Sequence, residues 1–125
     1  MPTTVGQKGR PMELRKHLRI EVVPPFPLAF SRIEVPVSFT GDTEGEGTVV
    51  NLSVKGCKVL SDAAVELGDH LSLSFDIRQK DPLMIDLATV RWAQGRAFGL
   101  EFISVGLAEE KRLRQFITVV AGSQK

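Results

Sequence analysis

The sequence predicts a mainly β protein: a small barrel of about six short antiparallel strands, plugged or flanked by a C-terminal helix. Strand-like stretches follow one another closely and are separated by turns rich in glycine or proline. Near the end of the chain, the apolar residues change from alternating to helical spacing. The length of 125 residues suits one domain with one core. We expect a flexible tail over residues 1–12, which show no periodicity, and a folded domain over residues 13–121.

The segment after the tail is expected to be extended. Pro24, Pro25 and Pro27 exclude a helix there and disfavour a central strand. We therefore expect an extended crossing segment, followed by a strand over residues 28–39 that is broken near Pro36.

The middle of the chain predicts three strands. Residues 41–47 are polar and rich in glycine, which is typical of a loop between strands. Residues 48–53 and 56–60 are expected to be short strands on either side of a turn. Residues 70–77 alternate strictly between apolar and polar, which predicts a half-buried strand. Its inward-facing residues would be Leu71, Leu73, Phe75 and Ile77.

The last third predicts two strands and a helix. The strands are expected at residues 83–92 and 97–102, joined through the sequence AQGR. A helix is expected over residues 107–120, ending near Gly122. Its apolar stripe consists of Leu113, Phe116, Ile117 and Val120.

The composition excludes several classes of protein. Sixteen basic and fifteen acidic residues leave a net charge of +1, which is too balanced for coating nucleic acid by charge alone. Binding of an anion would therefore need a local cluster. The single cysteine, Cys57, excludes an internal disulfide and favours a reducing compartment; a buried thiol is preferred over a nucleophile. No stretch is apolar enough to span a bilayer or to act as a secretory signal, so the sequence predicts a cytoplasmic protein.

The sequence contains no recognisable catalytic set. His17 and His70 lie far apart in sequence and lack the spacing of metal ligands. The serine-nucleophile motif, the dinucleotide-binding glycine fingerprint and the phosphate-binding loop are absent from the sequence. We therefore expect no enzyme activity, no metal site and no cofactor.

Two arginines, Arg15 and Arg19, lie four residues apart just after the predicted tail. A guanidinium group suits bidentate contact with phosphate and stacking on a planar ring. Two of them on a mobile segment could close over one anionic, aromatic ligand. Considered alone, a solvated basic turn explains the pair equally well.

The sequence NLSVKG at residues 51–56 is a second polar motif. Asn51 and Ser53 would share one face of a strand, where a carboxamide and a hydroxyl can pair with the edge of a purine base. Gly56 permits a tight turn or a close backbone approach to a ligand. The simpler alternative is an ordinary turn in which Asn51 and Ser53 bond to their own backbone.

Taken together, the two motifs resemble the PilZ domain family of bacterial cyclic di-GMP receptors. The family's patterns, Arg-x-x-x-Arg and Asp/Asn-x-Ser-x-x-Gly, are matched by Arg15, Arg19, Asn51, Ser53 and Gly56. The later sequence VRWAQGRAFGLEF is similar to the family's closing strands. The resemblance covers residues 13–120, nearly the whole chain.

The resemblance implies a six-stranded antiparallel barrel with a C-terminal helix and a flexible N-terminal arm that folds over cyclic di-GMP. The arginines would contact phosphates and stack on guanine, while Asn51 and Ser53 would bond to base edges or phosphate. Gly56 would let the backbone come close to the ligand. The signal would pass to an unidentified protein partner, without nucleic acid and without insertion into a membrane.

Two departures from the family's pattern modify this expectation. Asn51 stands where aspartate is common in the family, which removes a charge that could recognise guanine N–H groups. Leu14 stands where some relatives carry a further basic residue, which favours one bound ligand molecule over a stacked pair. Leu14, Lys16 and Trp92 are expected next to the ligand. For Trp92, however, a place in the core is the simpler interpretation.

Two other functions fit the same fold. A PilZ-like adaptor would use the barrel for protein contact and bind nucleotide weakly or not at all, although the motifs retained here favour a receptor. A barrel that binds single-stranded nucleic acid is disfavoured, because that role needs a basic groove with exposed aromatic residues. The chain has one Trp, no Tyr and seven Phe, mostly at core-like positions.

Overall fold

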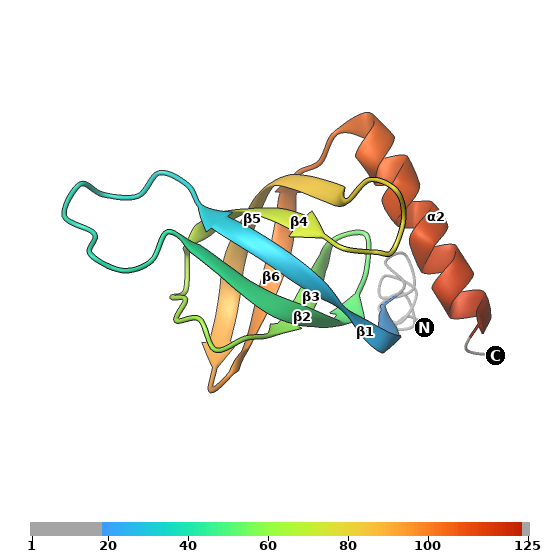
Figure 1. Ribbon diagram of the computed structural model, residues 1–125, viewed down its shortest axis with the longest axis horizontal. Coiled ribbons are helices and arrows are strands. Elements are labelled where there is room, and N and C mark those ends of the chain that lie inside the picture. Colours follow the sequence, from blue (N-terminus) through green and yellow to red (C-terminus); the bar gives the residue numbers. More distant parts are fainter. Residues whose placement is uncertain (1–18, 124–125) are drawn as a thin grey trace, which may run out of the picture.

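The computed structural model describes residues 19–123, in which six antiparallel strands close into a barrel with one helix across it (Figure 1). The strands are hydrogen-bonded in the order β1-β2-β3-β6-β5-β4. The elements are β1 (Ile20–Arg32), β2 (Glu44–Leu52), β3 (Gly56–Leu60), β4 (His70–Phe75), β5 (Leu83–Gln94), β6 (Ala97–Ser104) and α2 (Leu107–Ser123). The predicted fold class is confirmed. The expected tail at residues 1–12 and the expected contacts Leu14, Arg15 and Lys16 lie outside the described residues.

The core fills the inside of the barrel with one face of every strand. On β4, the inward residues Leu71, Leu73 and Phe75 are fully buried, as their alternation predicted. Ile77 is buried as well, although it follows the end of β4. Each strand therefore keeps its opposite face outside, and the outer faces are where a ligand has access.

β1 differs from its predicted limits, because it begins at Ile20 and ends at Arg32 instead of covering residues 28–39. The prolines are accommodated where the ladder to β2 is interrupted. Glu21 pairs with Asn51 and Phe26 with Val49, so four residues of β1 face a single residue of β2 between these pairs. Residues 22–25 contain the first two prolines, whose missing N–H groups remove no ladder hydrogen bond there.

β2 begins at Glu44, so the glycine-rich stretch expected to be a loop is half strand. Gly45 pairs with Phe30 of β1, and a Cβ atom at Gly45 would lie 2.4 Å from Cζ of that ring. Gly45 is thus needed because only a residue without a side chain leaves room for the Phe30 ring to pack against β2. Glycine content alone cannot distinguish this use from a turn.

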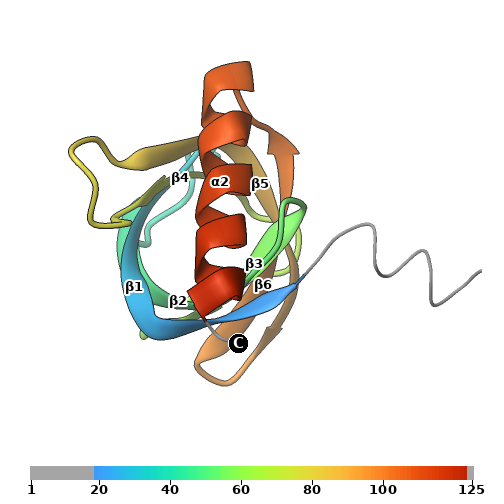
Figure 2. The ribbon, with the colours of Figure 1, turned by 90° about the vertical axis from the view of Figure 1, so that its right-hand side faces the viewer.

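α2 lies across one end of the barrel, and the first residues of β1 pass beneath its C-terminal end (Figure 2). Leu113 and Ile117 are buried, and the Phe116 ring packs edge-on against Phe26 at 5.4 Å between centroids. The predicted apolar stripe is confirmed, while the helix continues through Gly122. Within residues 19–123, no helix is both long and apolar enough to cross a membrane.

Candidate ligand-binding site

A row of four residues runs across the outer face of the barrel, one from each of four neighbouring strands. Asn51 of β2 pairs with Lys58 of β3, Lys58 pairs with Gly99 of β6, and Gly99 pairs with Trp92 of β5. Residues directly opposite each other in an antiparallel sheet share a face. Lys58 and Trp92 are exposed, so the row lies on the outside.

A β-bulge turns Trp92 outward. Val90 pairs with Leu100 and Trp92 with Gly99, which leaves Arg91 as an extra residue on β5. Trp92 is 41% exposed, so the alternative interpretation that placed it in the core is wrong. Its ring lies over Gly99, where an added Cβ atom would be only 2.0 Å from Nε1. Gly99 therefore makes room for a flat, accessible aromatic surface.

Arg19 reaches the other end of this row. It directly precedes β1, and its Nη1 donates a hydrogen bond to Oδ1 of Asn51 at 2.5 Å. The contact joins one residue of each sequence motif across 32 positions of the chain. Because the carboxamide carries no charge, the guanidinium keeps its full positive charge for a ligand.

Around the row lies a depression of about 460 Å³. It is called the basic depression below, and its lining residues are Arg19, Asn51, Lys55, Gly56, Cys57, Lys58, Arg91, Trp92, Gly99, Leu100 and Glu101. Four of these carry a positive charge and one, Glu101, a negative charge. Lys55 and Lys58 form no ion pair within residues 19–123, whereas Arg91 Nε lies 2.6 Å from Glu101 Oε1. A nearly neutral chain thus has a local cationic surface.

Ser53 lies elsewhere, in the turn between β2 and β3. It is 1% exposed and does not line the basic depression. Its backbone N–H donates to the Gly56 carbonyl at 2.8 Å, and its Oγ accepts from the Lys55 backbone N–H at 3.1 Å. Asn51 and Ser53 do not present their side chains together. The simpler interpretation, in which serine bonds to its own turn, describes this structure.

Gly56 lies in the wall of the basic depression and also at a point where two strands touch. A Cβ atom at this position would be 2.0 Å from the carbonyl oxygen of Leu100 on β6. Its φ is outside the left-handed region, so the turn itself does not require glycine. In this structure, Gly56 permits β3 to lie close to β6.

Cys57 is a buried thiol, as expected, and it borders the floor of the basic depression. Burial raises the pKa of the Cys57 thiol from an ordinary value of 9.0 to about 12, while the positive charge of Arg19 lowers it to a smaller extent. The thiolate is therefore a very minor species at neutral pH. A nucleophilic role has no support from this environment.

We predict that Cys57 reacts with a thiol reagent at pH 8 at least a hundredfold more slowly in the folded than in the unfolded protein. The shift of the pKa to about 12 leaves roughly a thousandfold less thiolate in the folded state. Since the folded state then keeps a proton that the unfolded state loses, the free energy of unfolding should fall as the pH rises from about 9 to about 12. Stopped-flow labelling with and without denaturant measures the rates, and Cys57→Ala should lose this alkaline dependence. Equal rates in the two states would contradict the prediction.

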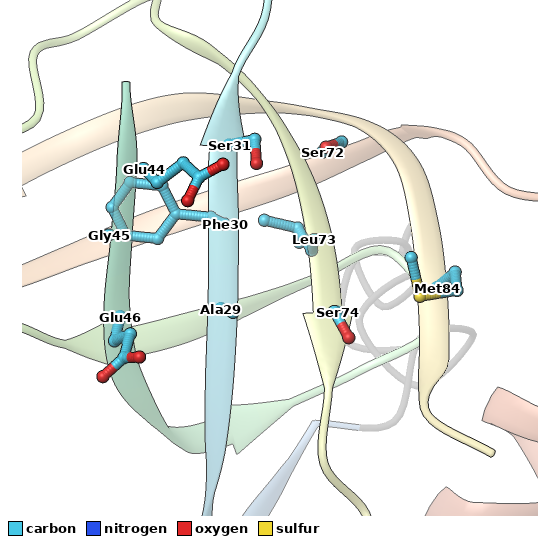
Figure 3. Close-up of a pocket in the computed structure, with 10 residues that line it drawn as sticks. All are labelled: Ala29, Phe30, Ser31, Glu44, Gly45, Glu46, Ser72, Leu73, Ser74 and Met84. Carbon is cyan, nitrogen blue, oxygen red and sulfur yellow. The ribbon is translucent and has the colours of Figure 1, made fainter. Parts of the chain in front are cut away.

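Another depression of about 420 Å³ lies over β1, β2, β4 and β5 (Figure 3). Its polar side chains are those of Ser31, Ser72, Ser74, Glu44 and Glu46, with no basic residue among those that line it. Two carboxylates repel a phosphate-bearing ligand. Of the two depressions, the basic one alone suits an anion. Residues 19–123 also contain no cluster of His, Cys, Asp or Glu that could hold a metal ion.

Sequence reasoning missed two charged residues of the basic depression, Lys58 and Glu101. Neither belongs to a motif, and the place of each depends on which strands pair and in what register, as does the bulge at Arg91. One signal was available for Gly99, because a glycine inside a strand often marks a close approach.

The fold and the basic depression define a small antiparallel barrel with a cationic outer face that carries an exposed aromatic residue. The sequence matches the PilZ domain family over residues 13–118, and the chain belongs to this family. PilZ domains are non-catalytic modules of cyclic di-GMP receptors. No curated protein sequence matches the chain.

Solved structures share the fold at low sequence identity. The PilZ domain of YcgR from Escherichia coli, solved with cyclic di-GMP, has a TM-score of 0.68 at 15% identity, covering 88% of this chain and 93% of that one. The inhibitor of motility MotI/DgrA from Bacillus subtilis has a TM-score of 0.65 at 16% identity, over 89% and 53%. A tetrameric PilZ domain from Xanthomonas campestris has a TM-score of 0.55 at 14% identity, over 96% and 98%. At these identities, the likeness establishes the fold alone.

Proposed function

We propose that this chain is a cyclic di-GMP receptor whose ligand lies in the basic depression and whose signal passes to a protein partner. The observation that carries the proposal is the row itself, with Arg19 held by Asn51 at one end and the exposed Trp92 ring at the other. Cyclic di-GMP has two phosphates and two flat bases, so it needs cations and an aromatic surface close together. Family membership and the YcgR domain solved with this ligand support the choice.

The basic depression offers a distinct group for each part of the ligand. Arg19, Lys55 and Lys58 supply charge-assisted hydrogen bonds to phosphate oxygens. Trp92 supplies a stacking surface for one guanine, a contact that contributes about 1–3 kcal/mol per base in proteins that bind single strands. Asn51 positions Arg19 through its oxygen and keeps its NH₂ group for the ligand. The Ser53 hydroxyl stabilises the turn between β2 and β3, and Gly56 permits the close contact between β3 and β6.

The N-terminal arm completes the proposed mechanism. We assign the receptor domain to residues 13–121, with Arg15 and Lys16 joining Arg19 around the ligand and Leu14 beside them. Ordering an arm costs conformational entropy, which the contacts of the arginines with the phosphates must exceed. The partner would then recognise the closed arm, an order–disorder switch driven by a small ligand. A cytoplasmic location agrees with this role and stays a prediction.

The test is a titration of the full chain with cyclic di-GMP, followed by calorimetry and by tryptophan fluorescence. Trp92 is the only Trp and the chain has no Tyr, so its emission reports on the basic depression alone. We expect saturable heat, with quenching of Trp92 at the same ligand concentration. In Gly99→Ala, the added Cβ displaces the ring, so the quenching should shrink while the barrel stays folded. If there is no heat at high micromolar ligand, the receptor proposal fails and the adaptor interpretation takes its place.

A further inference from the structure

Glu101 places a negative charge in a depression that we propose binds phosphate groups. It is the single carboxylate that lines the basic depression among the described residues, and its side chain is 47% exposed. It pairs with Gly56 on β3 and with Thr89 on β5, and its exposure shows that its side chain is on the outer face of the barrel. Near phosphates, a negative charge lowers affinity unless the ligand uses it.

The carboxylate is held in one orientation and still has room for a ligand. Oε1 accepts a hydrogen bond from Arg91 Nε at 2.6 Å, and Oε2 has no partner within residues 19–123. Since an ionised carboxylate accepts about four hydrogen bonds, most of its capacity is unused. Its neighbour across the strands, Gly56, has no side chain that would cover it.

Glu101 also lies beside the stacking surface. It is two residues from Gly99 on β6, on the same face and about 7 Å along the strand. The Trp92 ring rests on Gly99. A purine stacked on that ring is wide enough to bring one edge to Glu101. Asn51 is the other residue expected to read a base, but its oxygen already accepts the hydrogen bond from Arg19.

Guanine and adenine differ in what they offer a carboxylate. The Watson–Crick edge of guanine has two adjacent donors, N1–H and N2–H, which match the two oxygens of a carboxylate. Adenine has a hydrogen-bond acceptor at N1. This nitrogen would face the carboxylate oxygens, which are also acceptors, and the two would repel each other. On the basis of the proposed function, we propose that Glu101 reads guanine and selects cyclic di-GMP over cyclic di-AMP.

The experiment compares both dinucleotides on the wild-type chain and on Glu101→Gln, by calorimetry. Glutamine keeps the size of the side chain and an acceptor for Arg91 but removes the charge. We expect affinity for cyclic di-GMP to fall about tenfold or more, the usual size of a lost bidentate base contact, while affinity for cyclic di-AMP stays or rises. Glu44→Gln, at an exposed glutamate of the other depression, is the matched control and should change neither affinity.

The outcomes separate the two proposals. If Glu101→Gln raises affinity for both dinucleotides equally, the carboxylate only opposes the phosphates, and the reading role is wrong. Unchanged affinities overturn it as well, although the receptor proposal stands in both cases. A wild-type chain that binds neither dinucleotide overturns both proposals. Thermal unfolding of each variant verifies that the fold is retained.

Discussion

Replacing Arg19 with alanine is expected to lower the affinity for cyclic di-GMP by about 10- to 100-fold, since a hydrogen bond to a charged group contributes roughly 1.5–3 kcal/mol. Asn51 already holds the Arg19 guanidinium at 2.5 Å. Binding of the ligand therefore costs little further side-chain entropy at Arg19, and its contacts with the ligand count almost in full toward the affinity. Arg19 is exposed and outside the core, so the melting temperature should stay nearly unchanged. Calorimetric titration of the purified variant measures the loss.

A matched control distinguishes the loss of a specific contact of Arg19 with the ligand from the loss of one positive charge anywhere on the protein. Arg114→Ala removes the same charge from an exposed position on α2, where Arg114 pairs with Glu110. We expect this variant to bind like the wild type. Equal losses for both variants would mean that the whole field of the protein attracts the ligand, and the assignment of Arg19 to the site would be wrong.

Replacing Gly56 with alanine is expected to lower the free energy of unfolding by roughly 3 kcal/mol, at the upper end of the usual cost of overpacking. The added Cβ would lie 2.0 Å from the Leu100 carbonyl oxygen, a backbone atom that cannot rotate away. β3 and β6 must separate, or their ladder must break. For a domain of this size, the melting temperature should drop by more than about 10 °C, measured by circular dichroism.

Gly122→Ala provides the comparison for this prediction. Gly122 lies on α2 with no atom within 4 Å of an added Cβ, and alanine favours a helix, so a neutral or slightly stabilising effect is expected. If Gly56→Ala melts like the wild type but no longer binds cyclic di-GMP, the glycine acts on the ligand directly, and its role at the joint between β3 and β6 would be secondary.

The second motif therefore combines two kinds of requirement. Asn51 faces the basic depression, whereas the Ser53 hydroxyl and the missing Gly56 side chain serve the turn and the strand contact beside it. A motif read along the sequence cannot separate these roles. Only the register and the burial of each side chain distinguish a residue that would touch a ligand from one that holds the surface in shape.

The errors at the start of β1 and at Trp92 have one physical origin, which is the β-bulge. Proline disfavours a strand only where its N–H is needed, and the register shift after Glu21 removes that need. An extra residue at Arg91 reverses the face on which Trp92 appears. Bulges depend on how two distant strands fit together, so alternation within one strand does not reveal them.

The sequence by itself determined the fold class, the alternating core of β4, the apolar stripe of α2 and the two polar motifs. Each is local, because the spacing of residues along the chain decides which side of a strand or helix they occupy. The tertiary structure alone decided that Asn51, Lys58, Gly99 and Trp92 form one row with Arg19 at its end. It also decided that Glu101 lies among the cations. Arg19 and Asn51 meet because a closed barrel brings the start of β1 beside β2, and pairing between strands brings together residues that the sequence keeps far apart.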